Sequence, residues 1–212
     1  MTIQERAIKI AELVKEHYPS PKTELIHENE MQLAVSVMLS AQTTDKKVNQ
    51  ITRTLFPKYP SWDHFAQADL SQLQQDIRGV NFHLGKADRL IKAARMVLSE
   101  YSGCLPKAIP ELTRIPGIAR KTANVILNEV WDISEGVVVD THISRVSNRL
   151  GLTTNTDPVK IERDLMTLLP KNCWRTYSGG VVLHGRYVCT ARKPKCSECF
   201  LNEVCPSAFK VD

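Results

Sequence analysis

The hydrophobic and polar positions along the chain repeat with helical spacing from its first residues. On one face of an N-terminal helix the apolar residues are Ile3, Ala7, Ile10 and Val14. Thr2 and Glu5 have the spacing of a capping box, which marks the start of a helix. Pro19 follows the pattern, so we expect this helix to end near Tyr18.

A second segment, residues 30–41, is almost entirely apolar and therefore predicts a helix buried at the centre of a domain. Further helices are predicted over residues 45–56, 61–66, 71–77, 86–101, 110–114, 120–130, 140–150, 158–170 and 174–187. We expect Thr44 or Asp45 to cap the first of these, and Pro57 to stop it. No segment shows sustained alternation, and residues 136–139 are the single strand candidate. The pattern indicates an all-α protein.

Composition and charge agree with a globular protein and change this picture little. The chain has 212 residues, of which 42% are hydrophobic and 24% charged, with a net charge of +5. This is enough chain for one large or two small domains. The charge is compatible with a polyanion partner but does not establish one. No apolar run approaches membrane length, and the N-terminus does not resemble a signal peptide. We therefore expect a cytoplasmic protein without a membrane partner.

A tight turn between two predicted helices is the first candidate functional feature. Residues 115–118, Ile-Pro-Gly-Ile, fit a type II turn with Pro116 second and Gly117 third. The helix behind the turn begins with unpaired backbone N–H groups and the positive end of its dipole, which together suit a phosphate. A simple helical hairpin is the alternative interpretation, and the turn alone favours it.

Lys121 and Asp140 are the candidate chemical groups. Lys121 lies in the first turn of the helix after the hairpin, where cations are disfavoured. Arg120 and the helix dipole both favour the neutral amine, the form that a Schiff-base nucleophile needs. A carboxylate such as Asp140, held near an amine, can accept its proton or stabilise a developing cation. Taken singly, Lys121 is more often a solvated surface lysine.

Four of the six cysteines gather near the end of the chain, in the pattern C-x6-C-x2-C-x5-C. They are Cys189, Cys196, Cys199 and Cys205. Four thiols this close predict a metal site rather than a disulfide framework. The spacing alone does not separate zinc from iron–sulfur. We expect the other two, Cys104 and Cys173, to be buried packing residues.

These residues together resemble a known family. I-P-G-I-A-R-K-T-A followed by V-D-T-H is similar to the signature of the helix–hairpin–helix DNA glycosylases, L-P-G-V-G-x-K-T-A and V-D-T-H, in particular to their endonuclease III branch. The resemblance covers essentially the whole chain. It departs at Ala119, where the family hairpin usually has a second glycine. If that position needs positive φ, alanine costs on the order of 1 kcal/mol.

The resemblance implies a fold, a cofactor and a pair of catalytic residues. The fold would be two-lobed, with a helical barrel domain over residues 23–133 that contains the hairpin motif at about 112–130. Residues 1–22 and 134–212 would form a discontinuous iron–sulfur domain, with one 4Fe–4S cluster on the four cysteines. Lys121 and Asp140 would be the catalytic lysine and aspartate, on opposite sides of a cleft between the lobes.

The resemblance also implies which residues contact DNA. Gln42 and the loop at residues 80–83 match two segments that fill the gap left by a flipped base. That loop has Asn81 where the family usually has glycine, and His83 where it usually has an aromatic residue. The predicted DNA-contacting residues are Gln42, Phe82, His83, Pro116, Gly117, Ile118, Ala119, Arg120, Thr122, His142, Arg145, Arg192, Lys193 and Lys195. For Phe82 a place in the core is nearly as plausible, and for the last three a solvated loop.

The implied function is base excision repair by a bifunctional DNA glycosylase and abasic-site lyase. The enzyme would act on damaged pyrimidines in double-stranded DNA. It would be a monomer and would associate with the nucleoid through DNA binding. Mismatch-specific glycosylases of the same fold are one alternative, although those relatives usually lack the lysine at position 121. A non-catalytic DNA-binding iron–sulfur module is the other, and the presence of both Lys121 and Asp140 argues against it.

Overall fold

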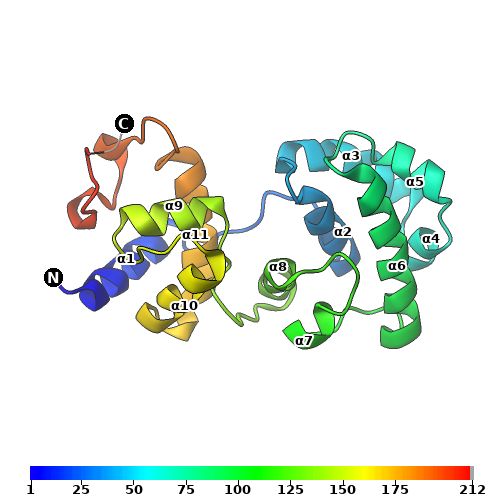
Figure 1. The fold of residues 1–212 in the computed structure, drawn as a ribbon, viewed down its shortest axis with the longest axis horizontal. Coiled ribbons are helices and arrows are strands. Elements are labelled where there is room, and N and C mark those ends of the chain that lie inside the picture. Colours follow the sequence, from blue (N-terminus) through cyan, green and yellow to red (C-terminus); the bar gives the residue numbers. More distant parts are fainter. Residues whose placement is uncertain (211–212) are drawn as a thin grey trace. The chain divides into compact units, whose positions relative to one another are not determined.

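The structure, a computed structural model, describes residues 1–210, and the regular secondary structure in this range consists of helices joined by loops (Figure 1). Its α-helices are α1 (Ile3–His17), α2 (Glu30–Ser40), α3 (Asp45–Lys58), α4 (Trp62–Ala66), α5 (Leu70–Asp76), α6 (His83–Tyr101), α7 (Ile109–Leu112), α8 (Arg120–Trp131), α9 (Thr141–Arg149), α10 (Pro158–Leu168) and α11 (Trp174–Tyr187). Three 3-10 helices are η1 (Lys171–Cys173), η2 (Cys196–Glu198) and η3 (Asn202–Val204). No β-strand forms within residues 1–210, where the candidate at 136–139 is irregular chain between α8 and α9. The all-α class is confirmed.

Side chains at the helix starts explain why several helices begin where the sequence predicts. The Thr2 hydroxyl accepts from the Glu5 N–H, and Glu5 accepts from the Thr2 N–H, so the capping box is present. Thr44 caps α3, and Asp157 caps α10. Each cap supplies an acceptor to an amide that has no partner inside the helix.

Three expectations about local structure were wrong. Helix α3 continues past Pro57 to Lys58, because the Tyr59 N–H still bonds the Leu55 carbonyl and the proline removes only its own donor. Helix α6 starts at His83 rather than at residue 86, since the Lys86 N–H already bonds the Phe82 carbonyl. Cys104 is exposed, so it is not the buried packing residue that we expected.

The chain divides into two compact units, and residues 23–133 form the first. Helix α2 lies at its centre, and most of its residues, from Met31 to Leu39, are buried. It contacts α3, α6 and α8, while α4 and α5 pack against α6. The nearly uniform apolar sequence of α2 is thus explained, because neighbours surround it instead of covering a single stripe.

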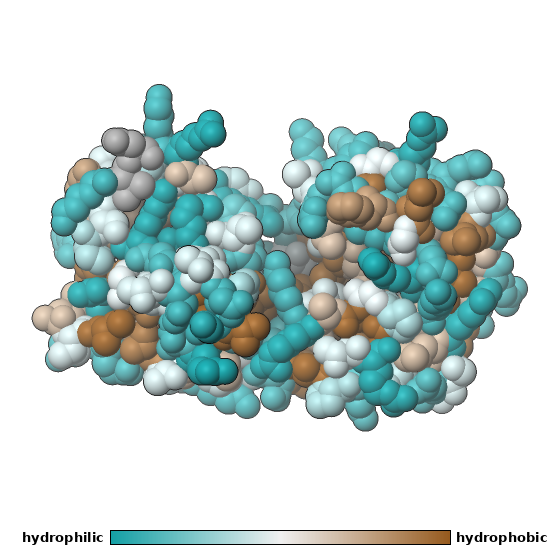
Figure 2. All heavy atoms as spheres, in the orientation of Figure 1, coloured by the Kyte–Doolittle hydropathy of each residue, from teal (hydrophilic) through white to brown (hydrophobic). Residues whose placement is uncertain are grey.

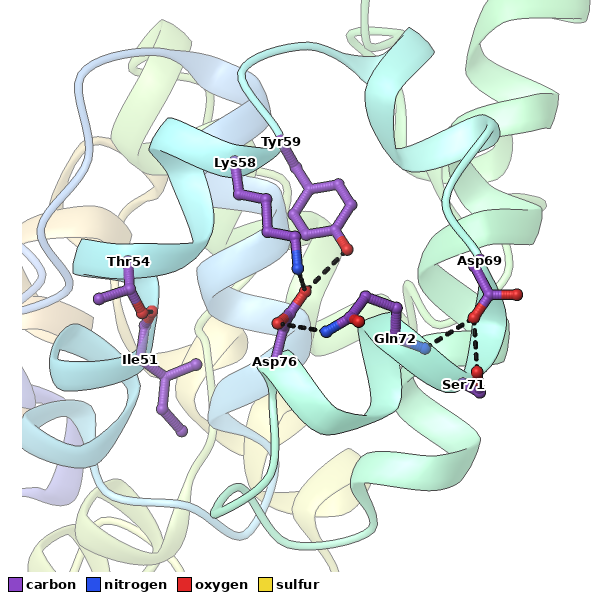
Figure 3. Close-up of polar contacts among 8 residues, drawn as sticks. All are labelled: Ile51, Thr54, Lys58, Tyr59, Asp69, Ser71, Gln72 and Asp76. Carbon is purple, nitrogen blue, oxygen red and sulfur yellow. Dashed lines mark hydrogen bonds and ion pairs between the residues drawn. The ribbon is translucent and has the colours of Figure 1, made fainter.

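A polar cluster ties the end of α3 to α5 in this unit (Figure 3). The Asp76 carboxylate accepts from Lys58 Nζ at 2.5 Å, the Tyr59 hydroxyl at 2.8 Å and Gln72 Nε2 at 3.0 Å. Burial works to raise the pKa of Asp76, but these donors outweigh it and hold the pKa below its usual range. The carboxylate therefore favours the folded state while it is ionised.

Residues 1–22 and 134–210 form the second compact unit; residues 211 and 212, which the predicted domain includes, lie outside the described part. Helix α1 packs against α10 and α11, and α9 packs against α11. A Cβ on Gly180 would lie 2.5 Å from Val14 Cγ1, so α1 and α11 approach each other too closely for a larger residue. The Tyr177 hydroxyl, buried between α11 and α9, lies 2.9 Å from Ser147 Oγ.

The face drawn in Figure 2 is mostly hydrophilic, with small separate apolar patches. Among residues 1–210, no helix combines the length and the apolar character that crossing a bilayer requires.

Candidate active site and DNA-binding elements

Helix α7, a tight turn and α8 form the predicted hairpin. The Ile118 N–H donates to the Ile115 carbonyl at 3.0 Å, and Gly117 has φ +88, which confirms the type II turn. Ile115 and Ile118 are buried and anchor the turn in the core. A Cβ on Gly117 would lie 2.6 Å from the Met38 Cε, so both the backbone angle and the space require glycine.

Helix α8 begins without a side-chain cap. Its N-cap is Ala119, which has no side chain that can accept a hydrogen bond. The amides of the first turn are therefore available to an anion, and the helix dipole favours one there. Ala119 has φ −85 and ψ 168, an extended conformation that any residue adopts. The expected strain at this departure from the family pattern does not arise.

The predicted residues of the hairpin differ in what they offer to a ligand. Arg120 and Lys121 are exposed on the first turn of α8, and Thr122 is half-buried. The Ile118 side chain is buried, so only its backbone can contact DNA. Pro116 is half-buried, and Ala119 and Gly117 are exposed.

Asp140 is the N-cap of α9, as the sequence predicts. One carboxylate oxygen, Oδ1, accepts from the Ile143 N–H at 2.8 Å, which fixes the side chain at the helix start. The segment before Asp140 is bonded to α11, because the Val138 N–H donates to Ser178 Oγ at 3.1 Å. Lys121 lies in the unit of residues 23–133 and Asp140 in the other unit, so each is positioned by its own core.

His142 and Arg145 follow Asp140 on α9, and Arg145 makes hydrogen bonds within the protein. Its guanidinium donates to the Gly185 carbonyl at 2.7 Å and to the Cys189 carbonyl at 3.0 Å. It also lies 3.3 Å from His142 Nδ1. Burial lowers the pKa of Arg145, as does the nearby charge of Arg149. Arg145 thus joins α9 to the end of α11 and the first cysteine, while a DNA contact by either residue stays a prediction.

The four thiols of the cysteine cluster line one pocket, together with apolar side chains that include Val146, Leu150 and Leu201. Arg149 donates to Cys189 Sγ at 3.3 Å, and His184 Nε2 lies 3.4 Å from Cys199 Sγ. Burial raises the pKa of Cys199, and a cation bound beside the thiol would favour the thiolate form.

This donor set fits a multi-iron cluster. In a 4Fe–4S cluster each cysteine ligates a different iron, so the ligands surround a cavity instead of converging on one point. The residues that would hold the cluster are Cys189, Cys196, Cys199 and Cys205.

The segment between the first two cysteines, residues 190–195, is called the basic loop here. Its three cations, Arg192, Lys193 and Lys195, are exposed. The backbone is held by the Thr190 hydroxyl, which donates to the Arg192 carbonyl at 2.8 Å, and by the Lys195 N–H, which donates to the Val188 carbonyl at 3.0 Å. A fixed backbone with exposed cations is suited to phosphate.

Two loops of the first unit, residues 41–44 and 79–82, are called the insertion loops here. Gln42 is exposed, with φ 56, and lies in the loop beyond α2 rather than at the helix end. Phe82 has φ 58 and is 66% exposed, so it is not a core residue. The left-handed residue is thus Phe82 and not its neighbour Asn81, which stands where the family usually has glycine. His83 is the half-buried first residue of α6.

The structure brings the two insertion loops together, which the sequence does not reveal. The Asn81 N–H donates to Thr43 Oγ1 at 3.0 Å, and Asn81 Nδ2 donates to the Gln42 carbonyl. The buried Lys86 was also missed, because a lysine one turn into a helix is normally solvated and nothing in its sequence context indicates burial. The contacts of His184 and Arg149 with cluster thiols were missed as well, because each joins residues that lie far apart in the sequence.

Comparisons with known protein families agree with this arrangement. The HhH-GPD superfamily of base excision DNA repair proteins matches residues 35–171. The iron-sulfur binding domain of endonuclease III matches residues 189–205, which span the four cysteines. Together with the pocket that the thiols line, this match identifies the cofactor as a 4Fe–4S cluster.

Individual relatives match over nearly their whole length. The endonuclease III of Synechocystis sp. is 44% identical over 205 residues, which are 97% of this chain and 94% of the relative. A solved non-covalent endonuclease III–DNA complex has 34% identity and a TM-score of 0.91, over 99% of this chain and 98% of that one. A trapped endonuclease III–DNA covalent intermediate matches with the same identity and TM-score, over 99% of both chains. The chain therefore belongs to the endonuclease III family within the HhH-GPD superfamily of base excision DNA repair proteins.

Proposed function

We propose that the protein is a bifunctional DNA glycosylase and abasic-site lyase that removes damaged pyrimidines from double-stranded DNA in the cytoplasm and acts as a monomer. The observation that carries the proposal is Lys121, exposed on the uncapped first turn of the hairpin helix α8. A covalent DNA intermediate has been trapped for an endonuclease III that matches this chain over 99% of its length.

The reaction begins when the neutral Lys121 amine attacks C1′ of the flipped nucleotide. The bond from C1′ to the base breaks, the base leaves with the electron pair, and proton transfer to it completes the departure. The sugar ring opens and leaves a protonated imine between Lys121 and C1′. Loss of a proton from C2′ then expels the 3′ phosphate, which cuts the strand by β-elimination.

Asp140 supports the steps in which positive charge develops. Its carboxylate, fixed by the Ile143 N–H, stabilises the cationic sugar as the base departs and can accept and return protons. The hairpin amides and the basic loop bind phosphates of the DNA backbone, and Gln42 and Phe82 fill the space that the flipped base leaves. The cluster stabilises the fold of residues 189–205, because metal ligation there contributes folding free energy.

Borohydride trapping on a duplex with one abasic site tests the proposal. We expect a covalent adduct of one protein per duplex, with the mass shift on the peptide that contains Lys121. Tight binding without an adduct would favour a non-catalytic DNA-binding module. Duplexes with single defined lesions then identify the base, and release of only mismatched normal bases would favour a mismatch-specific glycosylase.

A further inference from the structure

Lys86 is a buried lysine that bonds to the end of another helix. It lies on α6 and is 5% exposed, and its ammonium group donates to the Leu39 and Ala41 carbonyls, each at 2.7 Å. These carbonyls belong to the last turn of α2 and to its C-cap, directly before Gln42. Burial, and next the charge of Arg89, lower the pKa of Lys86. A cation at a helix C-terminus is well placed, since it meets the negative end of the dipole.

Lys86 is also bonded to the other insertion loop. Its backbone N–H donates to the Phe82 carbonyl at 3.0 Å and so closes the first turn of α6. One residue therefore holds the chain just before Gln42 through its side chain and the chain at Phe82 through its backbone. Asn81 adds the direct link between the loops, through Thr43 Oγ1 and the Gln42 carbonyl.

Both loop tips have conformations that require this support. Gln42 and Phe82 are non-glycine residues in the left-handed region, with φ 56 and φ 58, and both are exposed. Such residues persist only when the surrounding contacts fix them, and they concentrate at functional sites. Neither tip is fixed by burial of its own side chain, and the contacts of Lys86 and Asn81 are among those that hold the chain on either side of the tips.

We propose that Lys86 is a positioning residue that joins the two insertion loops into one preorganised unit. The inference rests on the proposed function, in which Gln42 and Phe82 enter the DNA beside the flipped base. Loops already in their bound shape lose less conformational freedom when they enter the duplex. Lys86 itself does not touch the reacting atoms, so its contribution is limited to the step that needs a flipped base.

The test compares two substitutions at Lys86 with a matched control on the same helix. Lys86→Met keeps the length of the side chain and removes all three donors, whereas Lys86→Arg keeps charge and donors. The control is Lys92→Met, because Lys92 is exposed and pairs with Asp88, one turn away on the same helix. All three are made in the full chain with its cluster.

Hydrogen exchange on the free protein measures the coupling without any substrate. In Lys86→Met, the amides of Thr43 and Asn81 should exchange faster together, by at least about 10-fold, since each Lys86 bond is charge-assisted. Lys86→Arg should regain part of this protection, and Lys92→Met should match the wild type. If only one of the two loops changes, or neither does, the loops are not joined by Lys86.

Single-turnover kinetics measure the consequence for the reaction. Lys86→Met should release a damaged base at least about 10-fold more slowly, yet cut a ready-made abasic site within about 3-fold of the wild-type rate. A purely structural role would lower both rates equally, and that result would overturn the proposal. A wild-type protein that releases no damaged base would refute the proposed function, while hydrogen exchange would still decide the coupling.

A second variant serves if Lys86→Met does not fold. Asn81 is exposed, so Asn81→Ala removes the link to the Gln42 carbonyl without opening the core. It should speed exchange at Thr43 and slow base release in the same selective way. Unchanged exchange and unchanged base release in Asn81→Ala would overturn the proposal.

Discussion

Asp140→Asn should separate the chemistry of Asp140 from its structural role, because asparagine caps a helix as well as aspartate does. In the structure, Asp140 Oδ1 accepts from the Ile143 N–H at 2.8 Å, and an asparagine carbonyl can accept the same bond. The substitution keeps size and shape and removes only the negative charge. Asp140→Ala removes the cap as well, so the pair of variants isolates each contribution.

The expected magnitudes follow from these contacts. Asp140→Asn loses the interaction of a charge with the helix dipole, about 0.3–1 kcal/mol of the free energy of unfolding. Asp140→Ala loses the capping bond too, about 0.5–2 kcal/mol. For base release, removal of a preorganised electrostatic stabiliser slows the step by about 10²–10³-fold. On a ready-made abasic site no base has to leave, so the loss there should be much smaller.

Three measurements on each variant check these values. Denaturant unfolding gives stability, single-turnover kinetics on a lesion duplex give base release, and borohydride trapping on an abasic duplex gives imine formation. Asp157→Asn is the matched control, because Asp157 caps α10 through the Lys160 N–H at 3.0 Å and is not among the proposed site residues. It should change neither reaction.

Two results would refute this reasoning. If Asp140→Asn loses as much stability as Asp140→Ala, the asparagine does not preserve the cap, and activity losses cannot be assigned to charge. If Asp140→Asn slows base release and abasic-site trapping by the same factor, Asp140 does not act chiefly on the departure of the base.

Three further predictions concern other parts of the molecule. Lys121→Gln should abolish borohydride trapping and strand cutting but keep DNA binding; a persisting adduct would assign the nucleophile to another amine. Neutralising the three cations of the basic loop should weaken binding to all sequences alike and flatten the salt dependence of affinity, whereas an unchanged slope would show that the loop does not touch phosphate. Asp76→Asn should lower the free energy of unfolding by about 1 kcal/mol at pH 7. Because the native pKa of Asp76 is lowered, this difference should begin to shrink as the pH falls below about 4 and disappear once the pH has fallen through the native pKa; a difference that persists in strong acid would contradict the carboxylate's role.

Helix positions were predictable from the sequence where local signals act alone. The capping box at Thr2 and the type II turn at Gly117 are determined by residues within a few positions of each other, and both were predicted. The start of α6 was not, because Gly85 lies in its first turn and argues against a helix there. Tertiary contacts, which the local pattern does not contain, set that boundary.

In the candidate site too, some features follow from the local sequence and others depend on tertiary contacts. The positions of Lys121 and Asp140 at helix starts follow from the local sequence. The link from Asn81 to Gln42 joins loops almost forty residues apart, and the carbonyl partners of Arg145 lie even further along the chain. Such contacts depend on how helices pack, so the sequence did not show that Arg145 also bonds to the end of α11 and to Cys189.

The discontinuity of the second unit has a consequence for how the protein is made. During synthesis α1 leaves the ribosome first, but α10 and α11, against which its apolar face packs, leave more than a hundred residues later. Residues 23–133 have a core of their own and can fold in the interval, since domains generally fold as units during translation. The four cysteines follow α11 in the sequence, so they are synthesised after both helices that cover α1. Until α10 and α11 have been made, the apolar face of α1 lacks the helices that cover it in the folded protein.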